Sequence, residues 1–160
     1  MTPPFKKLLA IDLGLRTGLA LYDETGHLLW YRSHHYGSIA HLKRAIYPLI
    51  QEIEGLAWLI IEGDRLLAEK WERVALKKGV SVRIIGAEAW RTRLLYAREQ
   101  RSGSDAKRHA DAQARKIIEW SEAPRPTSLR HDAAEAILIG IWGLLEVGWL
   151  KELPPVLRSR

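Results

Sequence analysis

The chain has 160 residues, 47% of them hydrophobic, so we expect a single domain over 1–160 with one core. It contains no cysteine, which excludes a disulfide framework, a thiolate zinc site and a catalytic cysteine, and favours the cytoplasm. The N-terminus lacks an apolar signal core, and the longest apolar run, 136–145, is shorter than the roughly 18 residues of a membrane span. The sequence therefore predicts a soluble protein with no membrane partner.

The net charge of +6 is concentrated in one segment. Residues 91–116 contain eight basic and three acidic side chains, which leaves the rest of the chain nearly neutral. Such a patch is typical of a surface that binds a polyanion such as a nucleic-acid backbone. The alternative is a charged surface that is only solvated.

The opening stretch, 8–21, predicts two strands. Residues 8–13 are apolar at both parities, as in a central strand covered on both faces, and 19–22 returns after a turn flanked by glycines. Asp12 falls within the first strand, where an ionised carboxylate costs several kcal/mol or more unless a cation compensates it. Alternatively, Asp12 accepts turn amides or pairs with Arg16.

The next segments predict a third strand that completes an antiparallel meander, followed by alternating helices and strands: strand 27–33, helix 38–54, strand 56–62, helix 66–78 and strand 80–85. The strand 56–62 repeats the opening pattern, because an apolar run ends in Glu62 followed by glycine. Two strands thus direct acids at one edge of a sheet. The alternative for Glu62 is a surface salt bridge.

The remaining sequence predicts helices over 88–96, 106–120 and 131–150, a basic loop over 97–105, and a loosely held tail from 153. Asp132 and Glu135 open the last helix, and their i, i+3 spacing puts both on one face, above the sheet edge. The same pair also fits an N-terminal capping pattern, which suits the helix dipole.

Two strand ends and one helix start thus supply four carboxylates, which can meet in a mixed sheet flanked by helices. Four such groups repel one another unless divalent cations lie between them, and oxygen ligands favour Mg²⁺, with Mn²⁺ as a substitute, over zinc. Two ions about 4 Å apart cleave phosphodiesters. We therefore predict the following catalytic and metal-binding residues: Asp12, Glu62, Asp132 and Glu135.

Two further side chains are weaker candidates. His131 could orient a metal-bound water, although a histidine at a helix start is more often simply exposed. Trp90 lies beside the basic segment and could stack on a base, although the tryptophans mostly fit apolar core patterns.

The order of these elements and three short motifs resemble the RuvC-type Holliday junction resolvases of the ribonuclease H-like superfamily. The motifs are Ile-Asp-Leu-Gly at 11–14, Ile-Ile-Glu-Gly at 60–63 and His-Asp-Ala-Ala-Glu-Ala at 131–136. The resemblance covers most of the chain. It implies an α/β ribonuclease H-like fold with a five-stranded mixed sheet, and a homodimer that binds four-way DNA junctions and makes one Mg²⁺-dependent nick per subunit.

The resemblance assigns Asp12 to the first-strand acid of the family, Glu62 to the fourth-strand acid, and Asp132 and Glu135 to the final helix. It also implies DNA-contacting basic residues before that helix, where Lys107 and Arg108 match; Arg101 and Arg115 of the same patch are further candidates. Glu135 stands where the family usually has aspartate. The basic segment also lacks the fuller glycine-rich run that cellular resolvases of this family have. The chain is therefore similar to a divergent, phage-type member.

Two alternatives remain beside the DNA resolvase. The opening motif also resembles YqgF-type nucleases that process RNA, which usually carry a Gly-Leu-Pro-like segment in place of Ile-Glu-Gly. The second alternative is a nucleic-acid-binding module that keeps the fold and the basic patch without catalysis.

Overall fold

The computed structural model describes residues 5–95 and 102–158. Five strands form one sheet in the spatial order β3-β2-β1-β4-β5. The first three pair antiparallel, whereas β4 pairs parallel with β1 and β5 parallel with β4. The strands are β1 (Lys7–Asp12), β2 (Arg16–Asp23), β3 (Leu28–His35), β4 (Leu56–Glu62) and β5 (Ser81–Ile85). The predicted mixed sheet with an N-terminal meander is confirmed.

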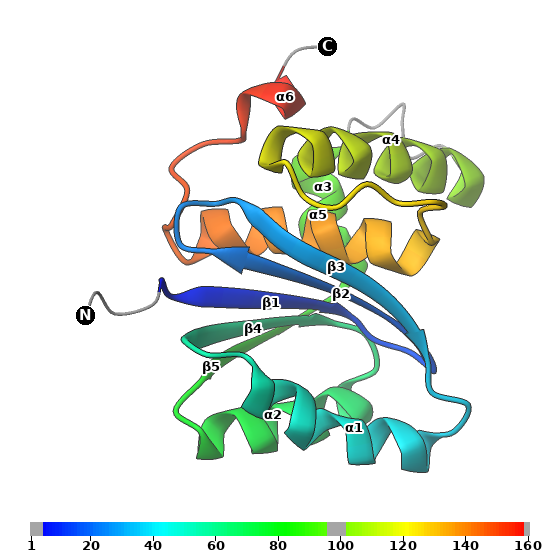
Figure 1. The fold of residues 1–160 in the computed structure, drawn as a ribbon. Coiled ribbons are helices and arrows are strands. Elements are labelled where there is room, and N and C mark those ends of the chain that lie inside the picture. The colour runs from blue at the N-terminus through cyan, green and yellow to red at the C-terminus, as the bar shows by residue number, and fades with distance from the viewer. Residues whose placement is uncertain (1–4, 96–101, 159–160) are drawn as a thin grey trace.

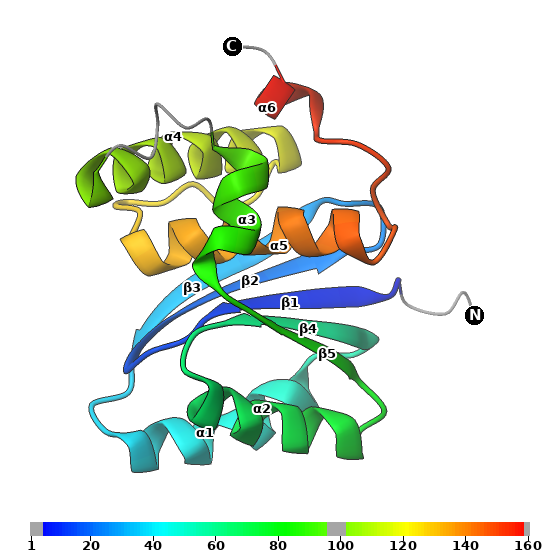
Figure 2. The ribbon, with the colours of Figure 1, turned by 180° about the vertical axis from the view of Figure 1, so that it is seen from behind.

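Helices cover both faces of this sheet (Figures 1 and 2). On one face lie α1 (Ile39–Glu52) and α2 (Arg65–Lys77); on the other lies α5 (His131–Glu146), with α3 (Ala87–Leu94) and α4 (Gly103–Ser121) packed outside it. The short α6 (Pro155–Arg158) lies beside α4. Within the described ranges, no helix is both long and apolar enough to cross a bilayer.

Each face has its own hydrophobic core, and β1 contributes to both. Leu8 and Ala10 belong to the cluster on the α5 side, whereas Leu9 and Ile11 belong to the cluster under α1 and α2. Because side chains alternate along a strand, the next residue, Asp12, lies on the α5 side. The apolar pattern at both parities thus reflects a strand that is covered on both faces.

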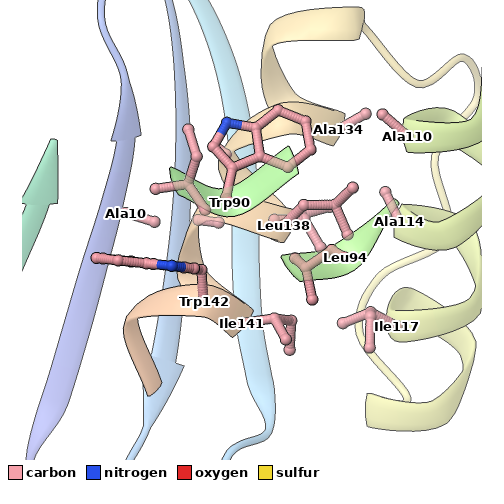
Figure 3. Packing of buried hydrophobic residues seen from close by; sticks show 14 of the residues in the cluster. Ala10, Trp90, Leu94, Ala110, Ala114, Ile117, Ala134, Leu138, Ile141 and Trp142 are labelled. Carbon is pink, nitrogen blue, oxygen red and sulfur yellow. The ribbon is translucent and has the colours of Figure 1, made fainter. Parts of the chain in front are cut away.

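Helix α5 is buried along almost its whole length, because the sheet lies on one side and α3 and α4 on the other. Its approach to the sheet is close: a Cβ added to Gly140 would lie 2.2 Å from a ring carbon of Tyr22. The hydroxyl of that tyrosine donates a 2.6 Å hydrogen bond to the carbonyl of Ile137. On the outer side, Trp90 of α3 lies beside Ala134 and Leu138 (Figure 3).

Two predicted helix boundaries and the prediction of a loosely held tail were wrong, each for a local reason. Helix α4 begins three residues before the predicted 106, because the hydroxyl of Ser102 accepts a hydrogen bond from the Asp105 amide and caps it. Helix α5 ends at Glu146 because Gly148 adopts a left-handed φ of +83°. The tail from 153 is held through α6, where Leu157 is only 4% exposed.

Candidate metal centre

The sheet places two of the predicted acids side by side. Asp12, the last residue of β1, pairs with Glu62, the last residue of β4, and on the other side with Gly18 of β2. Gly18 in turn pairs with Ser33 of β3, so these residues form one row across the sheet. Residues paired across strands share a face, so Asp12, Glu62 and Ser33 all lie on the side covered by α5.

The start of α5 lies directly on this row. A Cβ on Gly18 would sit only 1.9 Å from the carbonyl oxygen of Asp132, so only glycine permits the observed approach of the two backbones. This contact brings the buried side chain of Glu135 over the ends of β1 and β4. Ligand oxygens of Asp12, Glu62 and Glu135 then lie within 4.8 Å of one another, as a group that could hold a metal ion.

The electrostatics of this group disfavour the charged form of Asp12. Burial, the negative charge of Glu135 and contact with Glu62 together raise the pKa of Asp12 from 3.8 to about 9. Either a proton on Asp12 or a bound metal ion relieves the repulsion between these carboxylates. Three carboxylates provide the hard oxygen donors that Mg²⁺ and Mn²⁺ prefer, so the donor set fits such an ion.

The fourth predicted acid, Asp132, is not part of this group. Its two carboxylate oxygens accept hydrogen bonds of 3.0 and 2.8 Å from the hydroxyl of Ser33, on the β3 side of the row. Asp132 is 8% exposed, so Ser33 supplies a partner for a carboxylate that is largely removed from water. The structure thus brings together three of the four predicted ligands.

Glu135 has two partners that sequence analysis did not assign to it. Arg91 Nη2 lies 3.0 Å from Glu135 Oε1, and His131 Nε2 lies 3.0 Å from the same oxygen. His131 was considered as a residue that could orient a metal-bound water, and its i, i+4 spacing to Glu135 is a signal for this contact. Arg91 was counted only in the basic patch; the one available signal is its place on the helix that directly follows β5.

The predicted nucleic-acid-binding residues are surface residues of α4, with one exception. Lys107, Arg108 and Arg115 are exposed, and the two arginines form ion pairs along the helix, of 3.2 Å with Asp105 and 2.9 Å with Asp111. Arg115 also lines a hollow of about 750 Å³ beside the C-terminal half of α4. The fourth candidate, Arg101, lies outside the described residues.

Trp90 is fully buried, so the interpretation of this side chain as a base-stacking platform was wrong. The first turns of α4 and α5 lie at the same end of the molecule, the end at which β1 finishes (Figures 1 and 2). The first part of α4, which contains Lys107 and Arg108, therefore lies at the end of the molecule at which β1 finishes.

Comparison with known proteins finds similarity in structure alone. No protein-family model matches the chain. No curated protein sequence matches it either. T. thermophilus RuvC in complex with a Holliday junction substrate matches with a TM-score of 0.60 and 17% identity, over 89% of this chain and 96% of that one. The yeast mitochondrial Holliday junction resolvase matches with a TM-score of 0.61 and 10% identity, over 93% and 83%. The chain therefore has the α/β ribonuclease H-like fold of the RuvC-type resolvases, as predicted.

Proposed function

We propose that this protein is a metal-dependent endonuclease that resolves four-way DNA junctions by paired phosphodiester nicks. The observation that carries the proposal is the meeting of Asp12, Glu62 and Glu135, from two strands and one helix, within 4.8 Å. This group lies on the side of the molecule where the basic helix α4 begins. Two proteins of the same fold are a resolvase and a RuvC bound to a Holliday junction.

In this proposal Asp12, Glu62 and Glu135 hold Mg²⁺ or Mn²⁺, and Asp132 provides a fourth carboxylate at the same edge. When bound, such ions supply an activated water and stabilise the leaving oxygen. The protein's own contribution is to fix the ligand oxygens: the β1 and β4 register sets two of them, and the contact between α5 and Gly18 sets the third.

The substrate assignment comes from charge. Lys107, Arg108 and Arg115 lie exposed on one helix, and Arg101 belongs to the same basic segment. Lysine and arginine bind backbone phosphates whatever the base sequence, which suits recognition of a branched shape. Two symmetric nicks in one junction require two such sites, and we therefore propose that a homodimer is the active form.

The test is cleavage of a synthetic four-way DNA junction with and without Mg²⁺ or Mn²⁺. Asp12→Asn keeps the size of the side chain and removes its charge, so it should bind the junction and leave it uncut. Glu54→Gln, which removes an exposed carboxylate from the turn between α1 and β4, is the matched control and should cut normally.

The possible outcomes distinguish the proposed function from its two alternatives. Binding that is unaffected by magnesium, with no products from either protein, would identify a non-catalytic nucleic-acid-binding module. Cleavage of structured RNA in place of the junction would identify an RNA-processing nuclease. Metal-dependent paired nicks by the wild type alone would establish both the reaction and the role of Asp12.

A further inference from the structure

A single oxygen of the candidate centre contacts two basic side chains. Arg91 Nη2 and His131 Nε2 each lie 3.0 Å from Oε1 of Glu135. Arg91 donates a hydrogen bond to this oxygen, and His131 lies within ion-pair distance of it. Oε1 is thus engaged by protein groups in the arrangement described here, and coordination of a metal ion through this oxygen competes with the hydrogen bond from Arg91.

Arg91 reaches this oxygen from a third direction, separate from the strands and from α5. Helix α3 begins two residues after β5, and the last residue of β5, Ile85, pairs with Glu62. The guanidinium therefore lies at the same edge of the sheet as the carboxylates. The side chain of Arg91 is 33% exposed and that of Glu135 is 9% exposed, so solvent reaches the guanidinium more readily than the carboxylate.

The chemistry of the guanidinium allows Arg91 to exchange the carboxylate of Glu135 for a phosphate. A guanidinium is always charged, and its planar fork fits a phosphate as well as it fits a carboxylate. Where it stands, its positive charge also opposes the arrival of a divalent cation at Glu135. A backbone phosphate that enters the centre would offer Arg91 an equivalent partner from the solvent side.

We propose that Arg91 is a phosphate-binding and positioning residue, which holds Glu135 in the free protein and transfers to a phosphate of the nucleic-acid backbone when the substrate binds. The transfer frees Oε1 of Glu135 for the metal, so substrate and metal bind cooperatively. This inference rests on the proposed nuclease function. By thermodynamic linkage, the substrate raises the metal affinity by the same factor as the metal raises the substrate affinity.

The experiment measures Ca²⁺ affinity by isothermal titration calorimetry, for the protein alone and with a synthetic four-way junction, after subtraction of a titration into DNA alone. A denaturing gel checks that the DNA stays intact. For the wild type, the junction should raise the Ca²⁺ affinity by about fivefold or more, the lower end of usual coupling strengths. Arg91→Gln should bind Ca²⁺ more tightly than the wild type without DNA, and the junction should then add little.

Arg93→Gln is the matched control, because it removes the same charge from an exposed position on the same helix and should leave the metal affinity of the free protein unchanged. Arg91→Lys keeps the charge and should retain part of the coupling; it also serves if Arg91→Gln does not fold. In the presence of Ca²⁺, Arg91→Gln should reduce the slope of log affinity against log salt by about 0.9, the value for one phosphate contact.

The inference and the proposed function fail in different ways. If the wild type cuts junctions while Arg91→Gln keeps wild-type metal affinity, coupling and salt slope, only the inference is overturned. Weaker Ca²⁺ binding by free Arg91→Gln would also overturn it, since the arginine would then be preparing Glu135 for the metal. A wild type that neither binds nor cuts any nucleic acid removes the proposed function and the inference together.

Discussion

The raised pKa of Asp12 predicts that the metal-free protein loses stability as the pH rises. In the folded protein this pKa is about 9, against 3.8 for an ordinary aspartate. Below about pH 4, Asp12 is protonated in both the folded and the unfolded protein, and its contribution to the free energy of unfolding is fully present. Between the two pKa values, Asp12 keeps its proton only in the folded protein. Each pH unit in this window therefore lowers the free energy of unfolding by about 1.4 kcal/mol.

From pH 5 to pH 7 this amounts to roughly 3 kcal/mol, which for a protein of this size corresponds to a fall in Tm of roughly 5–10 °C. Asp12→Asn carries no charge at either pH, so this part of the fall should disappear. The measurement is thermal unfolding in EDTA at pH 5, 6 and 7, for the wild type, Asp12→Asn and the control Glu54→Gln. The control removes an exposed carboxylate and should follow the wild type.

Mg²⁺ or Mn²⁺ should reverse the pH effect, because metal binding releases the proton and is therefore favoured at higher pH. At pH 7, saturating metal should raise the Tm of the wild type more than at pH 5, and should leave that of Asp12→Asn nearly unchanged. Parallel pH profiles for the wild type and Asp12→Asn in EDTA would refute the reasoning, since Asp12 would then titrate alike in both states.

Three further predictions address the surroundings of the centre. Gly18→Ala should lower the free energy of unfolding by about 1–3 kcal/mol and weaken Mn²⁺ binding, because the new Cβ meets backbone at the start of α5; Gly103→Ala, where nothing lies within 4 Å, should be neutral or stabilising in the same urea titration. Lys107→Ala should weaken junction binding and flatten its salt dependence by roughly 0.9, as measured by fluorescence anisotropy, and an unchanged slope would remove Lys107 from the interface. Ser33→Ala should cost about 1–3 kcal/mol in urea unfolding because Asp132 loses its partner, and an altered Mn²⁺ affinity would indicate that Asp132 acts as a ligand.

Much of the fold could be predicted because its elements have strong and distinct periods. The strand around Asp12 is apolar at both parities, and the structure covers it on both faces. The error at the start of α4 has a different origin: Ser-Gly-Ser at 102–104 is typical of a loop, but Ser102 also makes a good N-cap. Local composition could not distinguish a loop from a helix start here, because the start of the helix depends on which of its residues pack against the rest of the protein.

The candidate site likewise contains residues whose positions could be predicted from the sequence and residues whose positions could not. Asp12 and Glu62 could be predicted from the ends of two buried strands, since strand register alone makes them neighbours. Asp132 and Glu135 share a helix face, yet one lies over Ser33 and the other over the β1 and β4 ends. That division depends on how α5 crosses the sheet, which a helical period does not encode. The contact of Arg91 with Glu135 joins residues 44 apart in sequence, so no local pattern could predict it.

The energetics of the three carboxylates indicate a binding site better than their proximity does. A structural ion-pair network would give each acid a cation or a donor, as Asp132 has in Ser33 and Glu135 has in Arg91. Asp12 differs: within the described part of the chain, every interaction that shifts its pKa, namely burial and the contacts with Glu62 and Glu135, disfavours its charged form. An alanine or asparagine at this position would remove that cost, so the carboxylate serves something other than stability. A divalent cation held by the three carboxylates would favour the charged form of Asp12.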